Sequence, residues 1–130
     1  MSKTHDKLVG SVPSRIVDQA PIALTPYEGR VAEFNVASWL QLHGHAGLGV
    51  SLVVKYRDGQ QRREATVDHG RTDTNGKILL SGVARVPVKS KIEDLQVYLR
   101  SNVVVELMKV DELFVQPAER TVLPDQLAQA

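Results

Sequence analysis

Hydrophobic and polar residues alternate along most of the chain between residues 31 and 115, in short runs separated by turn residues. The clearest run places large apolar side chains at every second position: Leu48, Val50, Leu52, Val54 and Tyr56. A period of two is typical of a β-strand with one face in a core, because successive side chains of a strand point to opposite sides. The pattern therefore predicts a half-buried strand over residues 48–56.

The same pattern predicts further strands, each bounded by glycine, proline or other residues that favour turns. These strands cover residues 15–17, 21–25, 31–42, 61–68, 78–86, 95–99 and 103–115. Asp58-Gly59 predicts a hairpin turn between two of them, and further turns are predicted at 26–29 and 73–76. The last strand is apolar on both sides at 103–105, which predicts a central position in its sheet. Residues 89–94 are expected to be a charged connector with one helical turn.

Strands spaced about ten residues apart and joined by turns predict an all-β fold, an antiparallel β-sandwich of the jelly-roll type. The more polar run 61–68 predicts an edge strand. No long amphipathic helix pattern is present, which argues against a parallel α/β sheet. We expect a flexible lead-in over residues 1–13, one sandwich domain over 14–117 and a C-terminal tail over 118–130.

Composition limits the classes of partner. The 130 residues suffice for one domain, and 42% hydrophobic with 24% charged residues is ordinary for a globular protein. A net charge of +1 gives no long-range attraction to nucleic acid or to an acidic membrane, so neither is an expected partner. The absence of cysteine excludes disulfides, thiol nucleophiles and cysteine-ligated metals. Without a signal segment or an apolar span of about 18 residues, the chain as written is expected to be cytoplasmic or a piece of a larger protein.

Several short motifs together resemble a known family. They are Ser38-Trp39, Tyr56-Arg57-Asp58-Gly59, Leu80-Ser81-Gly82, Val86-Pro87, Val97-Tyr98-Leu99 and Val110-Asp111-Glu112-Leu113. In this order they are similar to the jelly-roll carbohydrate-binding modules found beside xylanases and glucanases, which have a galactose-binding-like fold. The resemblance covers about residues 27–116 and implies a non-catalytic module that binds a glycan. It also places Asp111 where the family's closing strand supplies a calcium ligand, which implies a calcium ion there.

A glycan-binding surface needs flat aromatic rings that stack on sugar rings, and planar polar groups that bond to hydroxyls. Phe34 and Tyr56 follow the core alternation, whereas Trp39 and Tyr98 are phased away from it. Polar residues share the phases of these two candidates: Asn35, Gln41, Gln96 and Arg100. If the two strands belong to one sheet, the six residues form a glycan-binding face. The alternative is that Trp39 packs in the core and Tyr98 covers a loop.

Each of the other polar clusters has two interpretations, a functional one and a purely structural one. His43 and His45, with His69, offer imidazole ligands to zinc or copper, or else belong to a solvated loop. Residues 73–76 resemble the start of a calcium loop, but the rest of the EF-hand spacing is missing and a plain turn is expected. Four arginines would make a small basic patch that neighbouring carboxylates balance: Arg57, Arg62, Arg63 and Arg71.

Catalytic constellations are weak, so we expect that the protein is not an enzyme. Asp68-His69 with Ser51 or Ser81 would make a nucleophile triad, but no nucleophile elbow accompanies them. Cleavage of a glycoside needs two inward carboxylates at a defined separation. The mid-strand candidates are Glu33, Glu64 and Glu106, and for Glu106 a salt bridge at a rim or interface is expected instead.

A structural or assembly protein is the alternative function. The chain has few aromatic residues, lacks the family's opening strand and shows no export signal. A jelly roll with an incomplete sheet leaves an unpaired edge, which a second copy of the chain can cover. This alternative predicts a homo-oligomer that has lost sugar binding, with Val103–Val105 near the contact.

Overall fold

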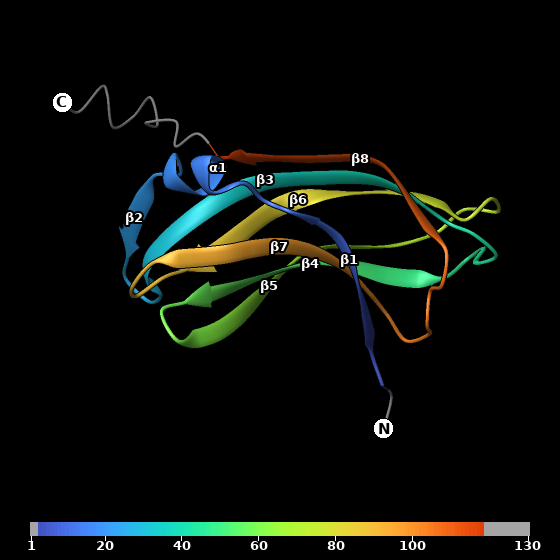
Figure 1. Cartoon of the computed structure of the whole chain (residues 1–130), viewed down its shortest axis with the longest axis horizontal. Coiled ribbons are helices and arrows are strands. Elements are labelled where there is room, and N and C mark those ends of the chain that lie inside the picture. The colour runs from blue at the N-terminus through green and yellow to red at the C-terminus, as the bar shows by residue number, and fades with distance from the viewer. Residues whose placement is uncertain (1–2, 119–130) are drawn as a thin grey trace.

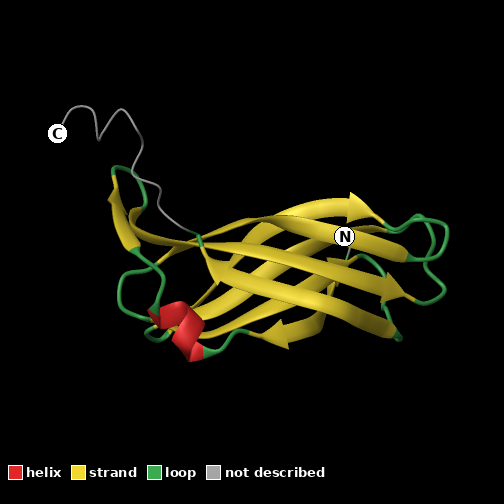
Figure 2. Cartoon of the chain, turned by 90° about the horizontal axis from the view of Figure 1, so that it is seen from above, coloured by secondary structure: helices red, strands yellow, loops and turns green. Residues whose placement is uncertain are grey.

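The computed structural model describes residues 3–118, which form eight strands and one short helix (Figures 1 and 2). In chain order the elements are β1 His5–Ser11, α1 Ser14–Asp18, β2 Ile22–Thr25, β3 Gly29–Leu42, β4 Gly49–Asp58, β5 Gln61–Arg71, β6 Lys77–Pro87, β7 Ile92–Ser101 and β8 Met108–Pro117. Within this part of the chain, no helix has the length and apolar character needed to cross a membrane.

The strands form two antiparallel sheets that face each other as two layers (Figure 1). Sheet A has the order β1-β7-β4-β5. In sheet B, β6 lies along one side of β3, while β2 and β8 pair with successive parts of its other side. The prediction of an all-β fold built of antiparallel sheets is confirmed, and the two-layer arrangement is that of a β-sandwich.

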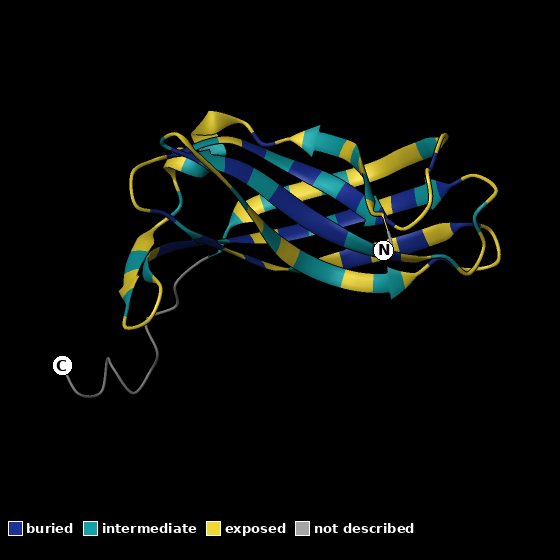
Figure 3. Cartoon of the chain, turned by 90° about the horizontal axis from the view of Figure 1, so that it is seen from below, coloured by how far each residue is buried: buried dark blue, intermediate teal, exposed yellow. Residues whose placement is uncertain are grey.

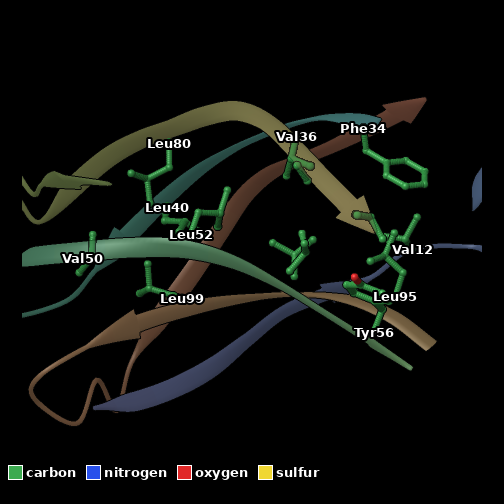
Figure 4. Close-up of a cluster of buried hydrophobic side chains, with 14 of the residues drawn as sticks. Val12, Phe34, Val36, Leu40, Val50, Leu52, Tyr56, Leu80, Leu95 and Leu99 are labelled. Carbon is green, nitrogen blue, oxygen red and sulfur yellow. The ribbon is translucent and has the colours of Figure 1, made fainter. Parts of the chain in front are cut away.

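Side chains from both sheets meet in one hydrophobic core between the layers (Figure 4). The largest fully buried side chains are Phe34, Leu40, Leu42, Leu52, Leu80 and Leu99. Buried and exposed residues alternate along the strands, as the sequence pattern requires (Figure 3). Phe34 and Tyr56 both lie in this core, as predicted. The hydroxyl of Tyr56 donates a hydrogen bond to the Pro87 carbonyl oxygen at 2.6 Å, so its polar end is not left unpaired by burial.

The long strands and their turns agree with the sequence pattern. β3, β4, β6 and β7 cover the predicted runs, and β5 lies at an edge of sheet A, as its polar composition indicates. The predicted hairpin joins β4 to β5. The predicted turn before β6 is closed by Asp73, whose carboxylate accepts the backbone N–H groups of Asn75 at 2.8 Å and Lys77 at 2.9 Å.

The start of the chain differs from the prediction in two places. The expected flexible lead-in over residues 1–13 contains β1, an edge strand that pairs with β7. β1 carries little apolar surface, and ladder hydrogen bonds and the ion pairs of Asp6 hold it in place. The expected strand over 15–17 is instead part of α1, because the Pro13 carbonyl accepts backbone hydrogen bonds from the following turn.

The end of the sandwich also differs from the prediction. The strand expected over 103–115 begins only at Met108, and in the described structure it pairs with β3 alone, so it is not central. The apolar segment before it is a loop in which Val105 is buried but Val103 and Val104 are exposed, so the run of valines does not mark a central strand. The connector 89–94 has no helical turn. Of the predicted C-terminal tail, residues 119–130 lie outside the described residues.

Candidate functional site

The six residues predicted to bind a glycan lie in two groups on opposite sides of the molecule. Three project from β3 onto the outer face of sheet B: Asn35, Trp39 and Gln41. Three project from β7 onto the outer face of sheet A: Gln96, Tyr98 and Arg100. Because the core separates the two layers, one surface cannot contain all six, and the expectation of a single shared face is wrong.

The outer face of sheet B, called the sheet B face below, carries a patch of exposed apolar side chains. Its large members come from three neighbouring strands: Trp39 on β3, Leu79 and Val83 on β6, and Phe114 on β8. Trp39 is directly opposite Leu79, and Phe114 is opposite Ala37, so the two aromatic residues are diagonal neighbours. Trp39 is 46% exposed and Phe114 is 42% exposed. The alternative in which Trp39 packs in the core is therefore wrong.

Amide side chains lie at both ends of this patch. Asn35 and Gln116 are opposite each other across the β3–β8 pair, and both are exposed. At the other end, Gln41 Nε2 donates a hydrogen bond to the Asn75 carbonyl oxygen at 3.4 Å. The sheet B face thus combines two aromatic rings with groups that can both donate and accept hydrogen bonds.

Phe114 is a member of this face that the sequence reasoning missed. The three valines at residues 103–105 would point to both sides of a strand and so predict one that is buried on both faces. This expectation obscures the alternation that follows it in the sequence. The signal that identifies Phe114 is the alternation after Asp111. Glu112, Phe114 and Gln116 form one face, and Leu113 and Val115 form the face that packs on the core.

On the outer face of sheet A, Arg100 is the centre of an ion-pair network that joins all four strands. Its guanidinium donates to both carboxylate oxygens of Asp6 on β1, at 2.7 and 2.9 Å, and to both of Glu64 on β5, at 2.5 and 3.0 Å. Lys55 Nζ on β4 lies 2.6 Å from Asp6 Oδ2. The hydrogen bond from Arg100 lowers the pKa of Asp6 from 3.8 to about 2, against the opposing effect of burial and with a further lowering by Lys55. The Arg100 network therefore adds side-chain links to the backbone pairing of sheet A.

Tyr98 and Gln96 also have partners on sheet A. The Tyr98 hydroxyl donates to Gln96 Oε1 at 2.9 Å, and Gln96 Nε2 donates to Ser11 Oγ at 3.3 Å. Lys55 Nζ lies 4.5 Å from the centroid of the Tyr98 ring, a cation–π distance. The pocket beside them, about 360 Å³ in volume, is lined mainly by charged side chains. A sugar ring that stacked on Tyr98 would have to displace Lys55.

Replacing Arg100 by methionine, which keeps much of the side-chain length, is expected to lower the free energy of unfolding by about 1–2 kcal/mol. Asp6 and Glu64 would lose their shared partner, and the loss should fall mainly on β1. Backbone amide exchange in β1 should therefore accelerate more than in β7. The control is Arg85→Met, because Arg85 also has two carboxylate partners but lies on sheet B. Equal acceleration in β1 for both variants, or none for either, would contradict the assigned role.

Ser51 and His69 meet, but they do not form a catalytic triad. Ser51 Oγ lies 2.8 Å from His69 Nδ1 across the β4–β5 pair. Asp68 does not orient this imidazole, because one carboxylate oxygen accepts the His69 backbone N–H at 2.8 Å and the other accepts the Ser81 backbone N–H at 2.9 Å. Ser81 itself is on sheet B. The pair therefore lacks the orienting group that triad catalysis uses.

The carboxylates considered for glycoside cleavage are not brought together. Glu33 is on sheet B, where a carboxylate oxygen lies 3.2 Å from Arg85. Glu64 is on sheet A and is bound to Arg100. Glu106 is exposed in the loop before β8. These positions do not provide the facing pair that such chemistry needs.

The arginines near the β4–β5 hairpin do not form one basic patch. Arg57 pairs with Glu93 and Asp94. Arg63 Nε lies 3.3 Å from a carboxylate oxygen of the buried Asp58. Arg71 is at the opposite end of β5, so the predicted cluster is divided between the two ends of the strand.

In residues 3–118, no group of three or more histidine, aspartate or glutamate side chains is arranged to hold a metal ion. His43 and His45 lie in the loop between β3 and β4, whereas His69 lies on β5. The carboxylate of Asp111 lies 3.3 Å from Lys109 Nζ. A lone carboxylate beside a lysine does not fit calcium, which takes roughly six to eight oxygen ligands. The surroundings of Asp111 therefore do not support the ion that the resemblance implies.

Comparisons with protein-family models, with curated proteins and with solved structures found no significant match to the chain. The choice of function therefore depends on the two outer faces. The side chains singled out on sheet A are bound to one another, whereas the aromatic rings of the sheet B face are accessible.

Proposed function

We propose that the protein is a non-catalytic carbohydrate-binding module of the jelly-roll, galactose-binding-like type, and that its sheet B face binds a glycan. The observation that carries this proposal is the exposure of two aromatic side chains, Trp39 and Phe114, on adjacent strands of one sheet face. The resemblance of the sequence motifs to such modules supports the same function.

The chemistry of the sheet B face suits a sugar chain. Exposed aromatic rings stack on the apolar C–H surface of pyranose rings, and diagonal neighbours on a sheet are roughly 7–8 Å apart, so one chain can contact both. Asn35 and Gln116 at one end, with Gln41 at the other, can donate to and accept from sugar hydroxyls. Because these three groups are neutral, their hydrogen bonds to a sugar should depend little on salt, and Glu112 opposite Trp39 is the charged side chain that a bound sugar would approach.

Trp39 is the only tryptophan of the chain, so its fluorescence reports directly on this face. A glycan that binds there should change the Trp39 emission and saturate. The Trp39→Ala variant should bind the same glycan at least about tenfold more weakly by calorimetry, which corresponds to about 1.4 kcal/mol. The glycans for this titration would be selected on a glycan array with the unmodified protein.

Tyr98→Ala is the matched control, because it removes an aromatic ring from the opposite layer. This variant should keep the full glycan affinity. If Trp39→Ala binds as well as the unmodified protein, or if only Tyr98→Ala weakens binding, the assignment to the sheet B face is wrong. If no glycan on the array binds, the sugar-binding function itself is contradicted.

Self-association is a second candidate function, and the exposure of Leu79 and Val83 favours it. With Trp39 and Phe114 they make a contiguous apolar patch of the kind that protein interfaces bury. A second copy of the chain would cover this patch, or the edge of β8 that pairs with no strand of the described structure. Light scattering after size-exclusion chromatography should then show a dimer at micromolar concentration, and Leu79→Lys should be monomeric. A monomeric unmodified protein contradicts this alternative.

A further inference from the structure

Another pocket lies on sheet A, at the end where β4 begins and β5 ends. Its volume is about 680 Å³, and four of its lining side chains carry the argument: Ser51, His69, Arg71 and Arg100. The described residues that line it include no aspartate or glutamate. This pocket, called the Arg71 pocket below, is therefore lined by basic, neutral polar and apolar groups, without an acidic side chain.

Arg71 is held in position by the backbone around it. Its Nη1 donates a hydrogen bond to the Gly47 carbonyl oxygen at 3.0 Å. Gly49 is opposite Arg71 in the β4–β5 pair, and the place that a Cβ would take on Gly49 is 4.0 Å from Arg71 Cζ, so the guanidinium lies beside the glycine. Across residues 3–118, Arg71 forms no ion pair with a carboxylate. Its charge is therefore not compensated, and its remaining N–H groups can bind an anion.

The charge of Arg100, by contrast, is already compensated. Arg100 and Lys55 supply two positive charges to their network, and Asp6 and Glu64 supply two negative charges. The network is therefore neutral as a whole, and it forms a wall of the pocket without adding net charge. The positive potential in the Arg71 pocket comes from Arg71.

The Ser51–His69 pair adds a hydrogen-bond donor in either arrangement of its protons. If the Ser51 hydroxyl donates to Nδ1, the neutral imidazole carries its proton on Nε2 and can donate there. If Nδ1–H donates to Ser51 Oγ, the hydroxyl proton is free to donate. Both residues line the pocket, so a bound anion can receive a hydrogen bond from one of them.

We propose that the Arg71 pocket binds a small oxyanion group, namely a carboxylate, sulfate or phosphate. The planar guanidinium of Arg71 would donate hydrogen bonds to two oxygens of the group. Ser51 or His69 would donate one further hydrogen bond to an oxygen of the same group. The pocket is on the opposite layer from the sheet B face. It can therefore bind its ligand whether or not the sheet B face binds a glycan.

The test is an NMR titration of the protein with sodium sulfate, phosphate and acetate at constant ionic strength. We expect saturable shifts of the backbone amides of Gly49, Ser51 and the end of β5. Arg71→Gln should weaken binding at least about tenfold, or about 1.4 kcal/mol. Arg62→Gln is the matched control, because it makes the same charge change on the same strand outside the pocket, and it should bind as the unmodified protein does. Circular dichroism would verify that both variants fold.

Two outcomes would overturn the proposal. Shifts that rise linearly without saturation would show that the ions are attracted only by overall charge, and an equal loss of affinity in Arg62→Gln would show the same.

Titration with glucuronic acid and glucose 6-sulfate distinguishes an anionic group carried by a sugar from a free anion. Tighter binding of these sugars than of the free ions, with the same dependence on Arg71, identifies an anionic sugar, and equal binding identifies the free anion.

Discussion

Replacing Asp58 by alanine is expected to lower the free energy of unfolding by about 3 kcal/mol and the Tm by about 10 °C. Asp58 is 5% exposed. Its carboxylate oxygens accept the backbone N–H groups of Lys89 at 2.9 Å and Ser90 at 2.8 Å, and Arg63 Nε lies 3.3 Å away. Alanine would leave the two backbone donors without this acceptor, and Arg63 without its carboxylate, in a place that water reaches poorly. Thermal and chemical unfolding would measure the loss.

The loss of stability should be large because the Asp58 carboxylate binds the segment that crosses from one sheet to the other. The segment 88–91 carries the chain from β6 in sheet B to β7 in sheet A, and Asp58 at the end of β4 binds its middle. The control is Glu93→Gln, which changes an exposed ion pair with Arg57 near the same hairpin and should have little effect. If the two variants unfolded alike, the proposed role of Asp58 would be contradicted.

Asp58 should also contribute to the pH dependence of stability. Burial alone would raise its pKa, but the hydrogen bonds from Lys89 and Ser90 and the charge of Arg63 bring the pKa below its ordinary value of 3.8. A carboxyl with a depressed pKa in the folded state stabilises the protein above its ordinary pKa, and this stability is lost as the pH falls through the lower folded value. Asp58→Asn should therefore show a shallower fall of stability below about pH 4 than the unmodified protein.

Replacing Gly76 by alanine is expected to cost more than about 3 kcal/mol. Gly76 has a φ of +75°, which an L side chain rarely adopts, and an added Cβ would collide with the Leu42 carbonyl oxygen. The surrounding backbone cannot move freely. The Leu42 N–H donates to the Gly76 carbonyl at 2.7 Å, and the Gly76 N–H donates to the Asp73 carbonyl at 3.0 Å. Chemical unfolding of the variant would show the loss directly.

Gly44→Ala separates the two causes of this loss. Gly44 has a φ of +83°, but an added Cβ would meet no atom within 4 Å. Its replacement should therefore cost only the conformational strain, about 1 kcal/mol. The difference between the two variants measures the collision with Leu42. Equal losses would mean that the turn adjusts to a Cβ at Gly76, and the argument from close packing would be wrong.

Much of the fold could be predicted from local pattern. The alternation around Phe34 and Tyr56 correctly places both side chains in the core, and Asp58-Gly59 correctly predicts the hairpin. The departures occur where a tertiary contact outweighs the pattern. β1 has few apolar residues and is held by its partner strand and by the ion pairs of Asp6. The apolar segment before Met108 is a loop and not a strand, and of its valines only Val105 packs in the core.

In the candidate site, too, some features follow from the local sequence pattern and others depend on tertiary contacts. Local phase correctly predicts that Trp39 faces away from the core, but it does not show that Phe114 is its diagonal neighbour. That relation depends on the register between β3 and β8, which are far apart in the chain. The contact between Ser51 and His69 depends in the same way on the register between β4 and β5.

By itself the sequence determined the long strands β3, β4, β6 and β7 and which side of each faces the core, because alternation and turn residues act between near neighbours. Only the tertiary structure decided which sheet each strand joins. Trp39 and Tyr98 have similar local patterns, yet β3 and β7 enter different sheets and the two rings lie on opposite layers. Strand order depends on pairing between distant segments and on how their apolar faces fill one core, and the spacing of residues along a single strand does not record either.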